Sequence, residues 1–356
     1  MDTKLVAAAL FSAVATHAMA AGAVFTISDD ATANSVLAFS RADDGSLHLE
    51  GTFPTGGKGS GGGEGVLGSQ GAVTLTGDGR FLLVVDAGSD EISVFRVHGA
   101  RLTQTSRVSS GGALPVSVAE HDGLVYVLDA GGDGNIAGLR LDEDGALRPV
   151  PGSVLPLSAA GTGPAQIGFD ASGRTLAVTE KASQTISLYR MGEDGRAAGP
   201  SPSPSAGATP FGFAFTRRDI LAVSEAGGGS VSSYDLEGGE LELVSATVSD
   251  GGRAPCWVVA TSDGRRVFVA NAGSGTVSSY LVDARGTLTL RDGTAGVIPG
   301  GKALDTALSA GDRFLYVIDP NHQAIQAFTV AADGSLAPLG EAASDLPPQA
   351  VGLAAR

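Results

Sequence analysis

The stretch FLLVVDAGSDEISVF, residues 81–95, decides the fold. Its first part is a continuous run of bulky apolar residues that closes on Asp86, which is typical of a strand buried on both faces. The last part, EISVF, alternates polar and apolar residues, which is typical of a strand with one buried face. A short Gly/Ser/Asp turn separates the two, so the stretch predicts a β-hairpin.

This hairpin recurs along the whole chain. Six further copies end at Phe39, Leu139, Tyr189, Tyr234, Tyr280 and Phe328. In each copy an acidic or amide residue closes the first strand, at Asp30, Asp86, Asp129, Glu180, Glu225, Asn271 and Asp319. These positions recur about every 48 residues, the length of a four-stranded propeller blade. The sequence therefore predicts an all-β fold, a seven-bladed β-propeller of four-stranded antiparallel blades.

The two ends of the chain predict how the ring closes. Short apolar runs such as AVTLT (72–76) and CWVVA (256–260) have the character of innermost strands, which crowd the axis. The C-terminal segment QAVGLAAR (349–356) has the same character, whereas the segment AVFTIS (23–28) already reads as a second strand. We expect the C-terminal strand to complete the first blade, which protects sheet edges that would otherwise be exposed.

Residues 1–20 have the three regions of an export signal: a polar start with Lys4, an apolar stretch, and the small-residue site Ala18-Met19-Ala20. The alternative is a disordered or helical N-terminus on a cytosolic protein. We therefore expect a signal peptide at 1–20, a propeller domain at 21–356, and a periplasmic or extracellular location. No other segment is long and apolar enough to cross a bilayer, so no transmembrane segment is expected.

Charge and cysteine content limit the partners. The formal net charge of -15 is unsuited to nucleic acid or anionic membrane surfaces. The single cysteine, Cys256, can form no internal disulfide and is interpreted as a buried packing thiol on an innermost strand. We expect a monomer whose partner is a small-molecule substrate or ligand.

Several motifs resemble the seven-bladed propeller lactonase family, which includes bacterial 6-phosphogluconolactonases and fungal carboxymuconate-lactonising enzymes, and in particular its exported branch. They are YVLDAG (126–131), AVTEKASQTIS (177–187), APCWVVATSDGRRVFVANAGSGTVSSY (254–280) and ADGSL (332–336). The resemblance covers the whole mature chain, with repeats similar to the YVTN type. It implies a hydrolase, without a cofactor, that opens a lactone or a related small sugar-derived or anionic ring.

Propeller topology places the acidic residues on one rim. The connections between blades share this rim with the turns between second and third strands, and it surrounds the mouth of the axial channel. Most of the acidic residues are interpreted as turn caps, so no metal site is expected. Glu180 and Glu225 deviate, because a longer side chain is a poorer cap and reaches further toward an axial ligand.

The resemblance also implies site residues. Ala-Val-Thr-Glu180 is similar to a family motif with a functional glutamate, so Glu180 is the predicted general base. Arg253 or Lys181 is the predicted cation that stabilises the charge on the carbonyl oxygen. The remaining candidates on this rim are predicted to bind substrate: Glu225, His322, Lys302 and Lys58. For the lysines and Arg253 the alternative is an ordinary solvated surface charge.

One departure from the family leaves a second function open. Family enzymes commonly carry Gly-x-Gly-Pro-Arg-His before the fourth blade, whereas this chain has GTGPAQ (161–166), with Ala165 and Gln166 at the last two positions. The alternative is a non-catalytic extracytoplasmic propeller that binds a small ligand, glycan or protein on the same rim. The glycine-rich segment 55–65 is predicted to be a rim loop near the channel mouth.

Overall fold

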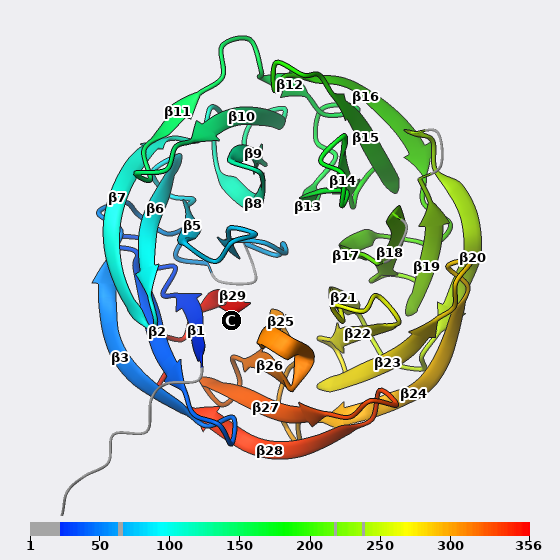
Figure 1. Cartoon of the computed structure of the whole chain (residues 1–356). Coiled ribbons are helices and arrows are strands. Elements are labelled where there is room, and N and C mark those ends of the chain that lie inside the picture. Colours follow the sequence, from blue (N-terminus) through cyan, green and yellow to red (C-terminus); the bar gives the residue numbers. More distant parts are fainter. Residues whose placement is uncertain (1–21, 63–66, 217–218, 237–238) are drawn as a thin grey trace, which may run out of the picture.

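The computed structural model describes residues 22–62, 67–216, 219–236 and 239–356. The predicted signal peptide lies outside the described residues. The strands form seven sheets in a ring around one axis, and each sheet is antiparallel (Figure 1). The predicted seven-bladed architecture is therefore confirmed.

The blades are numbered in chain order, with their strands given from the axis outward. Blade 1 has β29 (Val351–Ala355), β1 (Gly22–Ile27), β2 (Ser35–Arg41) and β3 (Leu47–Pro54), and blade 2 has β4 (Val73–Leu75), β5 (Phe81–Asp86), β6 (Glu91–His98) and β7 (Arg101–Ser109). Blade 3 has β8 (Pro115–His121), β9 (Leu124–Asp129), β10 (Asn135–Leu141) and β11 (Leu147–Pro149), with β12 (Leu155–Pro156) also paired to β10. Blade 4 has β13 (Pro164–Phe169), β14 (Thr175–Glu180), β15 (Thr185–Met191) and β16 (Ala197–Pro204).

The remaining blades repeat this order. Blade 5 has β17 (Pro210–Phe215), β18 (Ile220–Glu225), β19 (Ser230–Asp235) and β20 (Glu242–Ser249), and blade 6 has β21 (Pro255–Ala260), β22 (Arg266–Asn271), β23 (Thr276–Val282) and β24 (Leu288–Val297). Blade 7 has β25 (Thr306–Leu308), β26 (Phe314–Asp319), β27 (Ala324–Val330) and β28 (Leu336–Ala343). The short 3-10 helix η4 (Ala310–Asp312) connects β25 to β26. No helix among the described residues has the length and apolar character needed to cross a membrane.

Blade 1 closes the ring as predicted. Its innermost strand is β29 from the C-terminus, which pairs antiparallel with β1 near the N-terminus. The pairing is interrupted by a bulge, because Thr26 lies opposite Leu353 whereas Ile27 lies opposite Val351. The extra residue is Gly352, with φ of 69°. A bulge of this kind leaves one residue outside the regular ladder and redirects its backbone groups.

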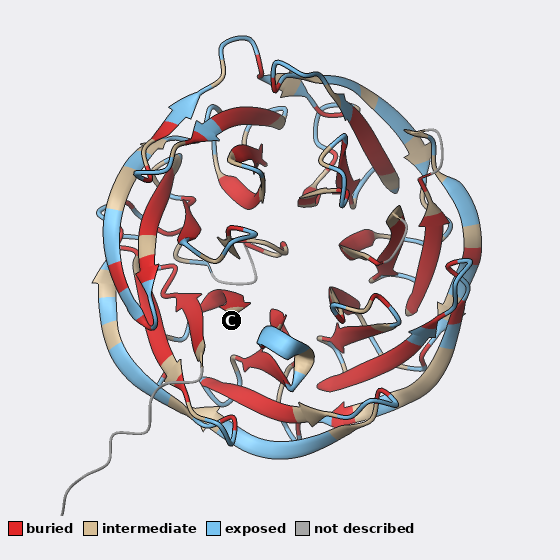
Figure 2. Cartoon of the chain, viewed as in Figure 1, coloured by how far each residue is buried: buried red, intermediate tan, exposed pale blue. Residues whose placement is uncertain are grey.

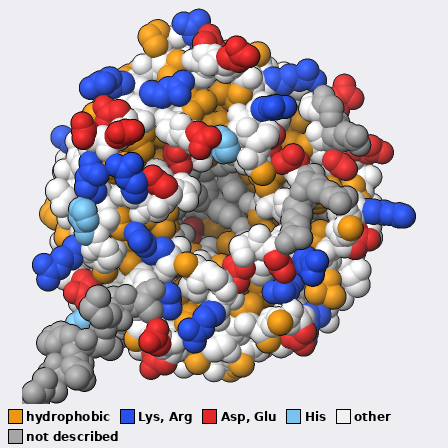
Figure 3. All heavy atoms as spheres, viewed as in Figure 1, with side chains coloured by type: hydrophobic (Ala, Val, Ile, Leu, Met, Phe, Trp, Pro, Cys, Tyr) orange, Lys and Arg blue, Asp and Glu red, His pale blue; other side chains and the backbone are white. Residues whose placement is uncertain are grey.

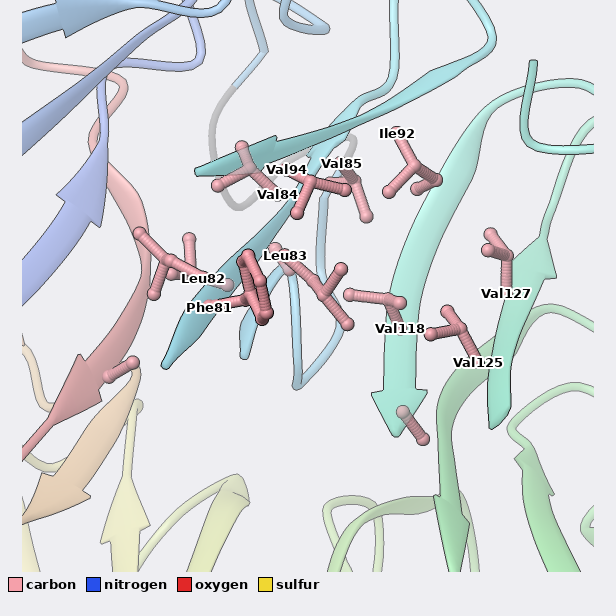
Figure 4. Packing of buried hydrophobic residues seen from close by; sticks show 14 of the residues in the cluster. Phe81, Leu82, Leu83, Val84, Val85, Ile92, Val94, Val118, Val125 and Val127 are labelled. Atoms are coloured by element: carbon pink, nitrogen blue, oxygen red, sulfur yellow. The ribbon is translucent and has the colours of Figure 1, made fainter. Parts of the chain in front are cut away.

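Burial follows the predicted order of strands. The second strands are buried along their length except at the first residue of β1 and of β22, whereas outermost strands such as β7 have many exposed residues (Figure 2). Blades pack face to face through apolar side chains, as where Leu83 of β5 is directed toward Val118 of β8 (Figure 4). The apolar side chains on the face of one blade are thus covered by the adjacent blade. Burial of these side chains is the main contribution to the stability of the fold.

The innermost strands are not equivalent. In blades 3 to 6 they begin at a proline, at Pro115, Pro164, Pro210 and Pro255. Blades 2 and 7 lack this proline and have innermost strands of only three residues. The channel wall is therefore regular on one side and irregular on the other, and the irregular side consists of the blades that flank the closure in blade 1.

Candidate functional site

The predicted base, Glu180, closes β14 and is fully buried. Ser158 Oγ donates to its Oε2 at 2.6 Å and Ser187 Oγ donates to its Oε1 at 2.5 Å. These hydroxyls come from the connection to blade 4 and from β15. The carboxylate therefore ties a connecting segment to its own blade, and it does not line the axial channel.

Glu225 is held in the same way in blade 5. Its carboxylate accepts hydrogen bonds from Ser230, Ser232 and the backbone of Gly207. The hydroxyl seven positions after the acid recurs in Asp86–Ser93 and Glu180–Ser187. In blade 1 the equivalent position is Ser28, because the turn there is longer, and the predicted Asp30 is an exposed turn residue.

The predicted cations do not join Glu180 in one cavity. Arg253 is exposed, and its Nη2 donates to Gly273 O at 2.6 Å. Lys181 lies closer to the axis, with Nζ 2.6 Å from Gly68 O and 5.0 Å from the centre of the Phe211 ring. Burial lowers the pKa of Lys181. Neither Arg253 nor Lys181 is among the described residues that line the channel.

The other predicted binding residues lie on the rim at separate blades. His322 Nδ1 is hydrogen-bonded to Asp319 Oδ2, and this carboxylate raises the pKa of His322. Asp319 Oδ1 also accepts the backbone N–H of Lys302 at 3.0 Å. Lys58 is exposed, and its backbone bonds to Ser89 and Gly88 of blade 2. Their roles in binding stay predictions.

The segment 67–71, which we call the plug, crosses the axis on this rim. Ser69 Oγ donates to Val116 O of blade 3 at 2.8 Å, and Gln70 N donates to Ala165 O of blade 4 at 3.0 Å. Trp257 of blade 6 donates from its indole Nε1 to Ser69 O at 2.9 Å. The plug is thus bonded to blades 3, 4 and 6, and it occupies the channel mouth that the sequence predicted to be the ligand site.

Beneath the plug the axial channel forms a cavity of about 380 Å³. Its wall is mainly apolar or glycine, and its polar residues are Gln70, Thr74, Glu120, Gln166, Asp305 and Thr306. The wall runs from Gln70 at the plug to Leu75 at the far end of β4, so the cavity extends toward the rim that carries η4. Figure 3 shows a hollow at the centre of that rim.

Asp305 of blade 7 is a buried acidic residue in this wall. It is 3% exposed, and its Oδ2 has no hydrogen-bond partner. Burial raises the pKa of Asp305 to about 7, although the backbone N–H of Gly352 and the Trp257 indole act in the opposite direction. Asp305 therefore lies between groups from blades 1 and 6, and at neutral pH it is poised between its acid and base forms.

Two neighbours complete the arrangement. The Gly352 N–H reaches Asp305 because the bulge in β29 takes it out of the ladder with β1. Thr306, next to Asp305, also lines the cavity, and its Oγ1 is buried without a partner. Unpartnered buried polar atoms are uncommon in folded proteins, and two of them on consecutive residues distinguish this part of the cavity wall from the rest.

Asp305 lies on the same connection as Lys302, between blades 6 and 7, and sequence reasoning does not single it out. A usable signal is the absence of proline at the start of this innermost strand, where blades 3 to 6 all have one. Within the described ranges, no three His, Cys, Asp or Glu side chains are grouped so that they could hold a metal ion.

The two positions that depart from the family motif have structural roles. Ala165 is fully buried, and its carbonyl accepts the N–H of Gln70, so the plug lies against it. Gln166 pairs with the backbone of Phe213 in blade 5, donating to its carbonyl at 3.0 Å and accepting its N–H at 2.7 Å. A small residue at 165 leaves room for the plug near the axis.

Comparisons with known proteins agree with this architecture. A family model described as a seven-bladed β-propeller lactonase matches residues 32–152 and 205–301, together more than half of the chain. Comparison with curated protein sequences gives no significant match.

Solved structures support the fold. A candidate 6-phosphogluconolactonase from Bacteroides fragilis has a TM-score of 0.73 and 17% identity, over 97% of this chain and 100% of the other. A second one, from Bacteroides uniformis, has a TM-score of 0.73 and 17% identity, over 93% and 98%. The periplasmic gluconolactonase of Pseudomonas aeruginosa has a TM-score of 0.66 and 20% identity, over 91% and 98%.

Proposed function

Because the chain belongs to the seven-bladed β-propeller lactonase family, we propose that it is an exported hydrolase that opens a lactone or a related small ring in its axial channel. The observation that carries the site is Asp305, a buried carboxyl group with a free oxygen and a pKa of about 7 in the wall of a cavity. A general base works best when its pKa is near the operating pH.

The proposed reaction needs no cofactor. Asp305 takes a proton from a water molecule as the water oxygen attacks the lactone carbonyl carbon. The hydroxyl of Thr306 donates to the negative charge that develops on the carbonyl oxygen. When the tetrahedral intermediate collapses, the bond between the acyl carbon and the ring oxygen breaks, and Asp305 returns its proton to that oxygen. The product is the open hydroxy acid.

Hydrolysis of a lactone panel by the mature protein tests this function, with Asp305→Asn beside the wild type. We expect Asp305→Asn to lower kcat/KM by about 10²- to 10⁴-fold, the range for loss of a general base. Asp129→Asn is the matched control, because Asp129 is also buried with one unpartnered oxygen and its pKa is also raised by burial, to about 6, but it does not line the channel. Absence of turnover on every lactone contradicts the hydrolase function, whereas equal turnover by Asp305→Asn contradicts only the base.

A second function, non-catalytic binding of a small ligand, glycan or protein, is favoured by one observation. Ala165 and Gln166 stand where the family resemblance implies an arginine and a histidine; Ala165 is buried, and Gln166 is hydrogen-bonded to the backbone of Phe213. Binding of a lactone without turnover, at any pH between about 6 and 9, distinguishes this alternative from the hydrolase.

A further inference from the structure

We propose that the channel accepts small, uncharged lactones with an aliphatic portion and rejects phosphorylated or carboxylated ones. This inference rests on the proposed function and adds the substrate class. It is carried by the charge, the polarity and the size of the cavity wall.

The wall has negative groups and lacks positive ones. None of the described residues that line the cavity is a lysine, arginine or histidine, whereas two, Glu120 and Asp305, are acidic. The Glu120 carboxylate accepts the backbone N–H groups of Gly77 and Gly123. The candidate cations point elsewhere: Lys181 Nζ donates to Gly68 O in the plug, and Arg253 donates to Gly273 O on the rim. A bound phosphate would therefore have acidic residues nearby and no compensating cation in the wall.

The size of the charge repulsion determines how strongly the channel selects against phosphorylated lactones. At an effective dielectric constant of about 20, two negative charges about 6 Å apart repel each other strongly enough to weaken binding on the order of 100-fold. Phosphate and carboxylate recognition in proteins generally uses arginine, lysine or clustered backbone N–H groups. The wall has no such cation, and its polar side chains are two carboxyl groups, two amides and two hydroxyl groups.

The rest of the wall favours an aliphatic ligand of limited size. Apart from its six polar residues, the lining consists of alanine, valine, leucine, isoleucine and glycine. A volume of about 380 Å³ is near the lower end for ligand pockets. These features fit a single ring with a short alkyl substituent better than a fully hydroxylated sugar, whose hydroxyl groups would lose water without gaining partners.

Trp257 provides a binding signal that does not depend on turnover. It is the only tryptophan in the chain, and its indole lies beside Asp305 and the plug. We would titrate the protein with δ-valerolactam, which has the shape of δ-valerolactone but resists hydrolysis, and with glucose 6-phosphate, and follow tryptophan fluorescence. We expect a saturable change with the lactam and at least about 100-fold weaker binding of the phosphate compound.

Turnover of a matched pair provides the second readout. Glucono-δ-lactone and 6-phosphoglucono-δ-lactone differ by one phosphate, and we expect kcat/KM to be on the order of 100-fold lower for the phosphorylated compound. Relative to both, δ-valerolactone should have the higher kcat/KM. Leu308→Lys places a cation in the wall and should narrow the difference between the gluconolactones, whereas Leu308→Gln, of similar size and uncharged, should not.

The outcomes separate the two proposals. Equal or better binding or turnover of the phosphorylated compound overturns the substrate class even if the protein is a lactonase. Saturable binding of the lactam with no turnover of any lactone overturns the hydrolase but supports the substrate class. Absence of a fluorescence response to every ligand, together with absence of turnover, overturns both. If Leu308→Lys does not fold, the comparison of the two gluconolactones with the wild-type protein still tests the substrate class.

Discussion

The side chain of Gln70 pairs with the backbone of Val258, 188 positions away in the sequence. Its Nε2 donates to Val258 O at 2.7 Å, and its Oε1 accepts the Val258 N–H at 2.8 Å. Gln70 follows the connection from blade 1, whereas Val258 lies on the innermost strand of blade 6. This pair fixes the plug across the axis, and so determines which end of the channel is closed.

Replacing Gln70 by alanine should loosen the plug. The change removes two hydrogen bonds and leaves both backbone groups of Val258 without these partners, which costs about 1–3 kcal/mol per unsatisfied group. We expect a lower urea midpoint and a red shift of Trp257 emission, since the indole is bonded to Ser69 in the same segment. Gln166→Ala is the matched control, because it removes the same kind of pairing, with Phe213, outside the plug. A red shift of equal size in both variants would argue against a specific role for Gln70.

Asp305 should make stability depend on pH. Its pKa is about 7 in the folded protein, whereas the ordinary pKa of an aspartate is 3.8, so the folded chain binds an extra proton between these values. Stability therefore falls as pH rises from about 4 to about 7, by up to about 4 kcal/mol, and this loss is absent in Asp305→Asn. Urea unfolding at pH 4.5 and pH 8 measures this loss. Relative to the wild type, the free energy of unfolding of Asp305→Asn should be higher at pH 8 than at pH 4.5. If the difference in unfolding free energy between the variant and the wild type is the same at both pH values, the pKa of Asp305 is not raised in the folded protein.

The same group sets the expected pH dependence of the reaction. Asp305 acts as a base only when it is deprotonated, so kcat/KM should rise with pH and level off above about 7. The residual activity of Asp305→Asn should lack this rise. If kcat/KM of the wild type is already independent of pH at pH 5, the general base is a carboxylate of ordinary pKa, such as another group on the rim.

Glu180→Gln distinguishes the base predicted from the sequence from the base proposed on the structure. The carboxylate accepts hydrogen bonds from Ser158 and Ser187 in a buried place, so the amide should lower stability by about 1–3 kcal/mol through weaker and partly mismatched bonds. We expect the folded variant to keep kcat/KM within a few-fold of the wild type. A loss of 100-fold or more at unchanged stability would restore Glu180 as the base.

Gly352→Ala tests the bulge as a positioning element. An added Cβ would lie 2.8 Å from Val73 Cγ2, and the φ of 69° is strained for alanine, so the variant should lose about 1–3 kcal/mol. Displacing the N–H that lowers the pKa of Asp305 should also move the rise of the kcat/KM profile to higher pH. Gly99→Ala is a control for strain alone, because its φ is 63° and nothing lies near its Cβ position. A loss of stability with an unshifted pH profile would leave the bulge with a purely structural role.

The fold was predictable because its signals are local. The run FLLVVD, the alternating strand that follows and the turn residues between them each depend on a few neighbouring side chains, and they recur seven times. The closure by QAVGLAAR followed from the same pattern, since an unpaired innermost strand at one end needs a blade at the other. The rim position of the acidic residues also followed, but not the direction of their side chains.

The sequence by itself therefore determined the number of blades, their strand order and the blade that joins the two ends. Only the tertiary structure decided which polar groups share the channel. Gln70, Trp257, Asp305 and Gly352 come from four distant parts of the sequence, and they meet only where the innermost strands converge on the axis. Their placement depends on a bulge and on bonds between blades that are not neighbours, and such long-range contacts leave no periodic trace in a sequence. The tertiary structure also showed that Glu180 and Glu225 each accept a hydrogen bond from a serine of their own blade, while their roles in the reaction stay predictions.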